Sequence, residues 1–441
     1  MHELIYHTKL RRLTWDNNYY LLEPDMLTYL DNKISGDRIL IDNIWGVIGV
    51  LDNYFIYVKK CELRCNYNDV EFYHIKEIGI IPLVNDPTNK YKLSLKDKLL
   101  SRSKLEKKIH SKEKETMVRI KKFIENHNFY VSHKKIEDDR FIWNTNMINN
   151  NISTQIYLFC GYINSKVSYR YTTTILSFIS KNRIGPRFIC RGVDDDGNSS
   201  FFVKTICQVK RDDEIINEKI LYRGSIPVYW EQKLSLRQEI KIYDKEHKIP
   251  FKKHFKVLQK ENKKIFVINL LSSKINELKL TEVFEKNLKE NEIEYCNFDM
   301  NKYHLNFTTM KKLFHYLLKD INEECLFRVN CLDCLDRTNL AQYLICDYYF
   351  SKTGYNFYVS NDLKKLWVDN GNALSYFYTG SDAQKSELAA KGKRSISGLL
   401  DDLYITTTRM INGSFTDKIK REIIDKILGK DKIKKDVKED E

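Results

Sequence analysis

The chain has 441 residues, of which 42% are hydrophobic and 12% aromatic, which is enough for two ordinary domains or one large one. Charged residues of both signs make up 30% of the chain and exclude global disorder, and ten scattered cysteines exclude a disulfide scaffold and indicate a reducing compartment. The formal net charge of +14 predicts a polyanionic partner, either nucleic acid, an anionic membrane surface or a phosphorylated substrate, with a composition bias toward lysine as the alternative.

The first 90 residues predict a mainly β domain. No basic segment followed by an apolar one opens the chain, so we expect no signal peptide. The polar pair at 52–53 divides the longest apolar stretch, so we expect a turn there, no membrane span and a soluble or peripheral cytoplasmic chain. Short apolar runs separated by turn residues, as in strands, occur at 38–41, 44–51, 54–58 and 78–84.

Residues 92–122 predict a lysine-rich helical stretch, because 12 basic and four acidic side chains are interspersed with apolar ones. Such a surface could meet anionic lipid. It could equally be the solvated face of an ordinary helix.

From residue 156 onward, strand-like and helix-like segments alternate, which predicts an α/β domain. Buried strands are expected at 266–271 and 326–329, and helices at 280–288, 340–350 and 416–428, with Gly429 as a stop. The chain is therefore predicted to have an N-terminal mainly β subdomain, an α/β catalytic domain and a charged disordered tail, at residues 1–165, 166–429 and 430–441.

The pattern Cys331-x5-Arg337 lies between an apolar strand and an amphipathic helix. Hydrolysis of a phosphate monoester needs a nucleophile in line with phosphorus, donors for three equatorial oxygens and an acid for the leaving alcohol. A loop at a helix N-terminus presents backbone N–H groups, and Arg337 adds a planar two-pronged donor. Both stabilise the thiolate of Cys331, whose ordinary pKa is about 8.5. We assign Cys331 as the nucleophile that forms a phospho-cysteine.

Five neighbouring residues complete the predicted site. Asp333 or Asp336 is the general acid and the other aspartate holds the loop, and the sequence does not decide between them. Thr338 is expected to cap the following helix and to assist the thiolate. Asn330 and Asn339 are expected to be structural.

Cys334 allows two other interpretations of the same loop. One is a zinc site that pairs Cys331 and Cys334 with Cys61 and Cys65. We disfavour it because the arginine and threonine that follow have no role in such a site. The other is that Cys334 traps an oxidised Cys331 as a reversible disulfide.

These residues resemble the Sac-domain phosphoinositide phosphatases. The family signature, close to Arg-x-Asn-Cys-x-Asp-Cys-Leu-Asp-Arg-Thr-Asn, is matched throughout residues 328–339. Other segments similar to family blocks follow in the family's order at 138–144, 183–194, 222–232, 367–380 and 392–394.

The resemblance implies a mainly β Sac subdomain followed by an α/β catalytic domain, with no metal or other cofactor. It implies removal of an inositol-ring phosphate from a membrane lipid, most often phosphatidylinositol 4-phosphate. An anionic bilayer is then the expected partner rather than nucleic acid, at the cytosolic face of endoplasmic reticulum or Golgi membranes. Basic residues expected to line a headgroup groove are Arg183, Arg187, Arg191, Lys385, Lys391, Lys393 and Arg394.

Two segments depart from the family pattern. Residues 201–206 lack the acidic positions of the family segment, and residues 298–301 keep Asp299 as a loop-supporting residue but lose a histidine. These changes affect headgroup selectivity and rate rather than the cysteine chemistry. A catalytically silent lipid-binding adaptor is one alternative, although the intact loop argues against it. A protein tyrosine phosphatase is another, although it would place histidine at Asn330.

Overall fold

The structure is a computed structural model of mixed α/β type. It describes residues 2–7, 12–15, 18–23, 26–30, 39–52, 54–82, 102–148, 155–187, 190–232, 239–259, 263–303, 306–354, 357–380 and 417–430. The chain divides into two compact units, Met1–Phe159 with Ile423–Glu441, and Cys160–Glu422. We call them unit 1 and unit 2.

Unit 1 is mainly β, and each of its sheets is antiparallel. The first sheet has the order β4-β3-β2-β1-β5, with strands Met26–Leu30, Asn18–Glu23, Arg12–Trp15, His2–His7 and Ile39–Ile44. The second runs β9-β8-β7-β6, with strands Phe129–Ser132, Val70–Pro82, Tyr54–Tyr67 and Gly46–Leu51.

The predicted turn at 52–53 is confirmed at Asp52, which has a φ of 51° between the paired residues Leu51 and Tyr54. Helix α2 (Arg102–Asn126) covers β8 with an apolar face that includes Ile120 and Ile124, both buried. The predicted helical stretch is therefore confirmed from Arg102 onward, and residues 92–101 lie outside the described residues.

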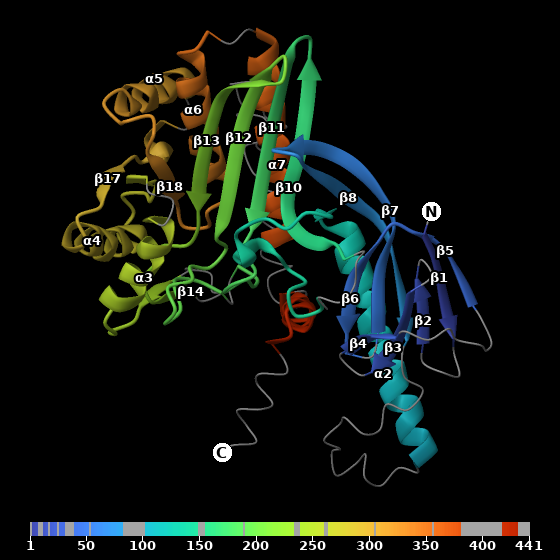
Figure 1. Ribbon diagram of the computed structural model, residues 1–441. Helices are drawn as coiled ribbons and strands as arrows, with labels where there is room; N and C mark the ends of the chain where they lie inside the picture. The colour runs from blue at the N-terminus through green and yellow to red at the C-terminus, as the bar shows by residue number, and fades with distance from the viewer. Residues whose placement is uncertain are drawn as a thin grey trace. The chain divides into compact units, whose positions relative to one another are not determined.

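Unit 2 is built on a mixed sheet whose strand order is β17-β16-β18-β13-β12-β11-β10. Strands β10 to β13 form an antiparallel meander (green in Figure 1), and β13, β18, β16 and β17 run parallel to one another. In sheet order these strands are Glu294–Asn297, Ile265–Asn269, Leu326–Asn330, Glu214–Arg223, Val203–Arg211, Tyr171–Ile179 and Tyr157–Ser168.

The core of unit 2 lies between this sheet and three helices, α5 (Phe307–Leu318), α6 (Asp336–Ser351) and α7 (Phe357–Thr379). Helix α6 packs between α5 and α7 and contacts β13 and β18. Its side chains are accordingly buried over most of its length, as expected for a helix covered on several sides. Unit 2 also contains α3 (Lys248–Gln259), α4 (Ile275–Glu290), the 3-10 helix η3 (Met300–Tyr303), β14 (Trp230–Gln232) and β15 (Ile240–Ile242).

The parallel strands place their carboxyl ends at one edge of the sheet. Those ends are Arg223, Asn269, Asn297 and Asn330, and the register pairs Asn269 both with Asn297 and with Asn330. Ligand sites in open α/β sheets lie outside this edge, so the fold predicts a site beside these four residues.

The compact units divide between Phe159 and Cys160, whereas the sequence placed a boundary after residue 165. Both positions lie within β10, which is one continuous strand. Residues 417–427 are helical, as predicted, and Gly429 has a φ of 67°. From Ile423 onward this segment groups with unit 1, where Lys426 forms an ion pair with Asp52, rather than with unit 2.

Candidate active site

The candidate nucleophile Cys331 lies where a buried strand passes into a helix. Strand β18 ends at Asn330, α6 begins at Asp336, and Cys331 is only 2% exposed. Cys334 has a φ of 56°, in the left-handed region that non-glycine residues seldom occupy. This turn lets the Cys334 amide donate to Cys331 Sγ over 3.2 Å. The predicted strand, loop and helix are confirmed.

The surroundings of Cys331 favour its thiolate. Burial raises the pKa of Cys331, but hydrogen bonding from Cys334, the charge of Arg337 and the Thr338 side chain together lower it to about 5. The pKa of Cys334 is instead raised well above its ordinary value by burial and by the neighbouring Cys331. The loop therefore holds one thiolate at neutral pH, and it is on Cys331.

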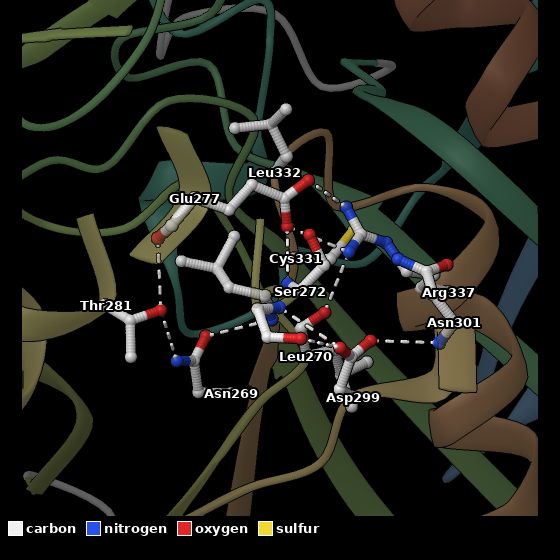
Figure 2. Close-up of polar contacts among 12 residues, drawn as sticks. Asn269, Leu270, Ser272, Glu277, Thr281, Asp299, Asn301, Cys331, Leu332 and Arg337 are labelled. Atoms are coloured by element: carbon white, nitrogen blue, oxygen red, sulfur yellow. Dashed lines mark hydrogen bonds and ion pairs between the residues drawn. The ribbon is translucent and has the colours of Figure 1, made fainter. Parts of the chain in front are cut away.

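Arg337 lies beside Cys331 and is held by another part of the sheet edge (Figure 2). Its Nη1 donates to the Leu270 carbonyl over 2.9 Å and to Glu277 Oε2 over 3.0 Å, and its Nη2 donates to Glu277 Oε1 over 3.3 Å. Burial lowers the pKa of Arg337, but the charges of Cys331 and Glu277 raise it above its ordinary value. Arg337 is therefore a fixed cation at the loop.

Asp299 supports the β16–α4 loop, residues 270–274, which contains Leu270, one of the residues that contact Arg337. Its Oδ2 accepts from the Ser273 amide over 3.1 Å and from the Ser273 hydroxyl over 3.0 Å. Its Oδ1 accepts from the Asn301 amide over 3.0 Å. Asp299 is thus a loop-supporting residue by contact, but the loop that it supports is not the one that contains Cys331.

Asp333 is held by two arginines of the basic segment. Arg187 Nε donates to Asp333 Oδ1 over 3.0 Å, and Arg191 Nη2 donates to the same oxygen over 2.6 Å. Arg191, which is 3% exposed, also donates to the Leu332 carbonyl and to Gln232 Oε1. The structure therefore brings Arg187 and Arg191 to the loop between Cys331 and Arg337, where they contact protein groups.

Arg183 takes a different place, because its Nη2 donates to the Arg191 carbonyl over 2.6 Å rather than to the loop. The four other basic residues predicted to line the groove lie outside the described residues, at Lys385, Lys391, Lys393 and Arg394. The predicted groove therefore remains a prediction.

Thr338 does not cap α6, contrary to the prediction. The helix begins at Asp336 with Leu335 in the capping position, and Leu335 makes no side-chain capping bond. Thr338 is buried one position past Arg337, where its side chain faces the Cys331 thiolate instead of a free helix amide. Asp336 is the first helical residue and is half-buried.

Asn330 and Asn339 lie in buried polar networks. Asn330 Nδ2 donates to Asn269 Oδ1 over 2.8 Å. Asn339 Nδ2 donates to the Trp367 carbonyl over 2.7 Å, and its Oδ1 accepts from Asn370 and Arg223. These contacts tie the loop to β16, to α7 and to β13.

Three charged residues of the site were not singled out from the sequence. Arg223 and Arg328 are fully buried, and burial lowers the pKa of each to about 10. Arg328 sits directly behind the loop and donates to Asn330 Oδ1 and to the Ser225 carbonyl. Both arginines lie within the segments that resemble the family pattern, at 222–232 and 328–339, so the sequence could have marked them as site residues. Glu277 had no such signal, because an acidic residue in the first turn of a helix is common.

Within the described part of the chain, no three His, Cys, Asp or Glu side chains group closely enough to hold a metal ion. Cys61 and Cys65 both lie on β7, half-buried and buried respectively. The zinc alternative therefore gains no support from these residues. None of the described helices combines the length and the apolar character that crossing a bilayer requires.

Comparison with known proteins relates the chain to enzymes of phosphoinositide metabolism. It is 32% identical over 300 residues to the Inositol-1,4,5-trisphosphate 5-phosphatase 1 of Schizosaccharomyces pombe, covering 58% of this chain and 27% of that protein. It is 33% identical to the Polyphosphatidylinositol phosphatase INP53 of Saccharomyces cerevisiae, and the match covers 61% of this chain and 28% of that protein. The chain thus spans little more than a quarter of these two relatives.

A third relative matches over more of its length. The Phosphatidylinositol-3-phosphatase SAC1 of Saccharomyces cerevisiae is 25% identical, with 90% of this chain and 73% of that protein aligned. The family model described as the SacI homology domain matches residues 42–304, which is more than half of the chain. The chain belongs to the SacI homology domain family.

Proposed function

We propose that the chain is a phosphatase that removes phosphate from the inositol ring of membrane lipids, with phosphatidylinositol 4-phosphate as its main substrate. The observation that carries the proposal is the buried thiolate of Cys331, whose pKa is about 5, beside the fixed cation Arg337. Membership of the SacI homology domain family supports the substrate class, since the three relatives above are named as phosphatases of inositol phosphates or phosphoinositides.

In the proposed reaction, Cys331 Sγ attacks phosphorus and the bond from phosphorus to the ring oxygen breaks. The leaving oxygen takes a proton from an acid, and a phospho-cysteine remains. Water then attacks phosphorus, the P–S bond breaks and the thiolate of Cys331 is restored as phosphate leaves. Backbone N–H groups at the start of α6 and the Arg337 guanidinium stabilise the equatorial oxygens in both steps.

We assign the proton transfers to Asp336. Asp333 is bound by Arg187 and Arg191, and these two ion pairs fix it as a loop anchor. Asp336 lies next to Arg337 as the first residue of α6 and is half-buried. It can therefore give a proton to the leaving oxygen and take one from the attacking water.

The surplus of basic residues supports action at an anionic bilayer. The net charge is +14, and each lysine or arginine near such a surface contributes about 1 kcal/mol to binding. The proposed site of action is the cytosolic face of endoplasmic reticulum or Golgi membranes, which rests on the family resemblance alone.

The test is phosphate release from liposomes that carry single phosphoinositides. Wild type should release phosphate, most rapidly from phosphatidylinositol 4-phosphate, and Cys331→Ser should release none. Cys61→Ser, which changes a half-buried cysteine of unit 1, is the matched control and should behave as wild type. Equal release by wild type and Cys331→Ser would end the proposal, and binding without release would identify the silent adaptor instead.

A further inference from the structure

We propose that Glu277 positions Arg337 and thereby determines which edge of the guanidinium meets the phosphoryl group. The inference rests on the proposed function, because it assigns a positioning residue to the same loop. Glu277 lies in the first turn of α4, the helix that follows β16, and β16 is the strand next to β18 in the sheet. Glu277 precedes Arg337 by 60 residues in the chain.

The contacts of Arg337 use three of its five N–H bonds. The two Nη1 hydrogens go to the Leu270 carbonyl and to Glu277 Oε2, and one Nη2 hydrogen goes to Glu277 Oε1. Glu277 thus holds the end of the guanidinium in a bidentate pair, the arrangement that fixes the plane of an arginine best.

The remaining donors of Arg337 are Nε–H and the second Nη2–H. They lie on one edge of the planar group, and no acceptor among the described residues takes either of them. Two parallel N–H donors match two oxygens of a phosphoryl group. Glu277 therefore leaves free the one edge of Arg337 that can bind a tetrahedral oxyanion bidentately.

Glu277 is itself fixed. Its Oε2 accepts from the Ser272 amide over 2.6 Å, and its side chain is 12% exposed, against 16% for Arg337. Asp299 holds the adjacent Ser273 of the same loop through two hydrogen bonds. An ion pair anchored in this way from one side keeps its geometry when the ligand site is empty, which is the condition for a preorganised oxyanion site.

The test uses the oxyanion tungstate, which is tetrahedral and is not hydrolysed, and isothermal titration calorimetry on the full chain. Glu277→Gln keeps the volume of the side chain but removes its charge, and it should weaken tungstate binding and kcat/KM by roughly 10-fold or more, since misplaced groups cost up to about 100-fold. Glu282→Gln, an exposed glutamate on the same helix, is the matched control and should change neither.

A double-mutant cycle separates positioning from a purely structural role. In the Arg337→Ala background, Glu277→Gln should change tungstate binding less than about 2-fold, because the residue through which it acts is gone. The same loss in both backgrounds, or an unchanged affinity in the single variant, would refute the inference. A wild type that binds tungstate and shows this coupling but releases no phosphate from lipid would refute the proposed function and leave the role of Glu277 standing.

Discussion

Cys331 and Cys334 occupy one tight loop, yet their surroundings act on the two thiols in opposite directions. The left-handed turn at Cys334 points its amide at Cys331 Sγ, while the Cys334 Sγ lies 3.4 Å from the Cys331 carbonyl. Arg337 adds its charge on the side of Cys331. Backbone geometry and a single cation therefore select which of two neighbouring cysteines is ionised.

This selection predicts the pH dependence of alkylation. The folded-state pKa of Cys331 is lowered, so its thiolate persists as the pH falls until about 5 and is lost below that value. Iodoacetamide alkylation of Cys331, followed by peptide mass spectrometry, should therefore have a midpoint near pH 5, and Cys334 should react slowly throughout. A midpoint near the ordinary thiol value of about 8.5 would contradict the assignment.

The two loop aspartates should also separate by experiment. A general acid contributes about 100-fold to 10,000-fold with a poor leaving group and much less with a good one. Asp336→Asn should therefore slow hydrolysis of a phosphoinositide far more than hydrolysis of para-nitrophenyl phosphate. Asp333→Asn, which loosens a loop anchor, should slow both reactions to a similar extent. The reverse pattern in kcat would assign the acid to Asp333.

At the scale of elements, the order of strand, loop and helix around Cys331 could be predicted from apolar runs and turn residues. The pairing of β16 with β18 could not, because Asn269 and Asn330 are far apart in the chain and nothing local encodes their register. The role of Glu277 could not be predicted from the sequence for the same reason. Its contact with Arg337 exists only because parallel strands bring the start of α4 beside the start of α6.

The segment 138–144 resembles a family block in sequence, but only the structure shows what its side chains do. Asn144 is fully buried, its Nδ2 donates to the carbonyls of Ile48 and Ile156, and its Oδ1 accepts from the Leu158 amide. One side chain thus satisfies three backbone groups within unit 1.

Replacing that side chain should destabilise unit 1. Each buried polar group left unpaired costs about 1–3 kcal/mol, so Asn144→Ala should lower the free energy of unfolding by roughly 3 kcal/mol or more. Asn146→Ala, at an exposed position two residues on, is the matched control and should have little effect. Urea denaturation followed by circular dichroism measures both, and equal stability of the two variants would rule out this role of Asn144.

At the scale of the whole molecule, the sequence predicted a mixed α/β fold, which is confirmed, and a mainly β N-terminal part followed by alternating segments. It did not predict that residues from Ile423 onward return to unit 1, because that depends on long-range contacts such as the one between Lys426 and Asp52. The net charge of +14 predicted a polyanionic partner. Membership of the SacI homology domain family supports the proposal that this partner is an anionic lipid.

The covalent intermediate tests the central claim most directly. Wild type mixed with phosphatidylinositol 4-phosphate vesicles and quenched rapidly with acid should yield a peptide that carries one phosphoryl group on Cys331, found by mass spectrometry. Cys331→Ser, treated in the same way, should carry none and release no phosphate. A phosphoryl group on Cys334, or phosphate release without any modified cysteine, would contradict the account.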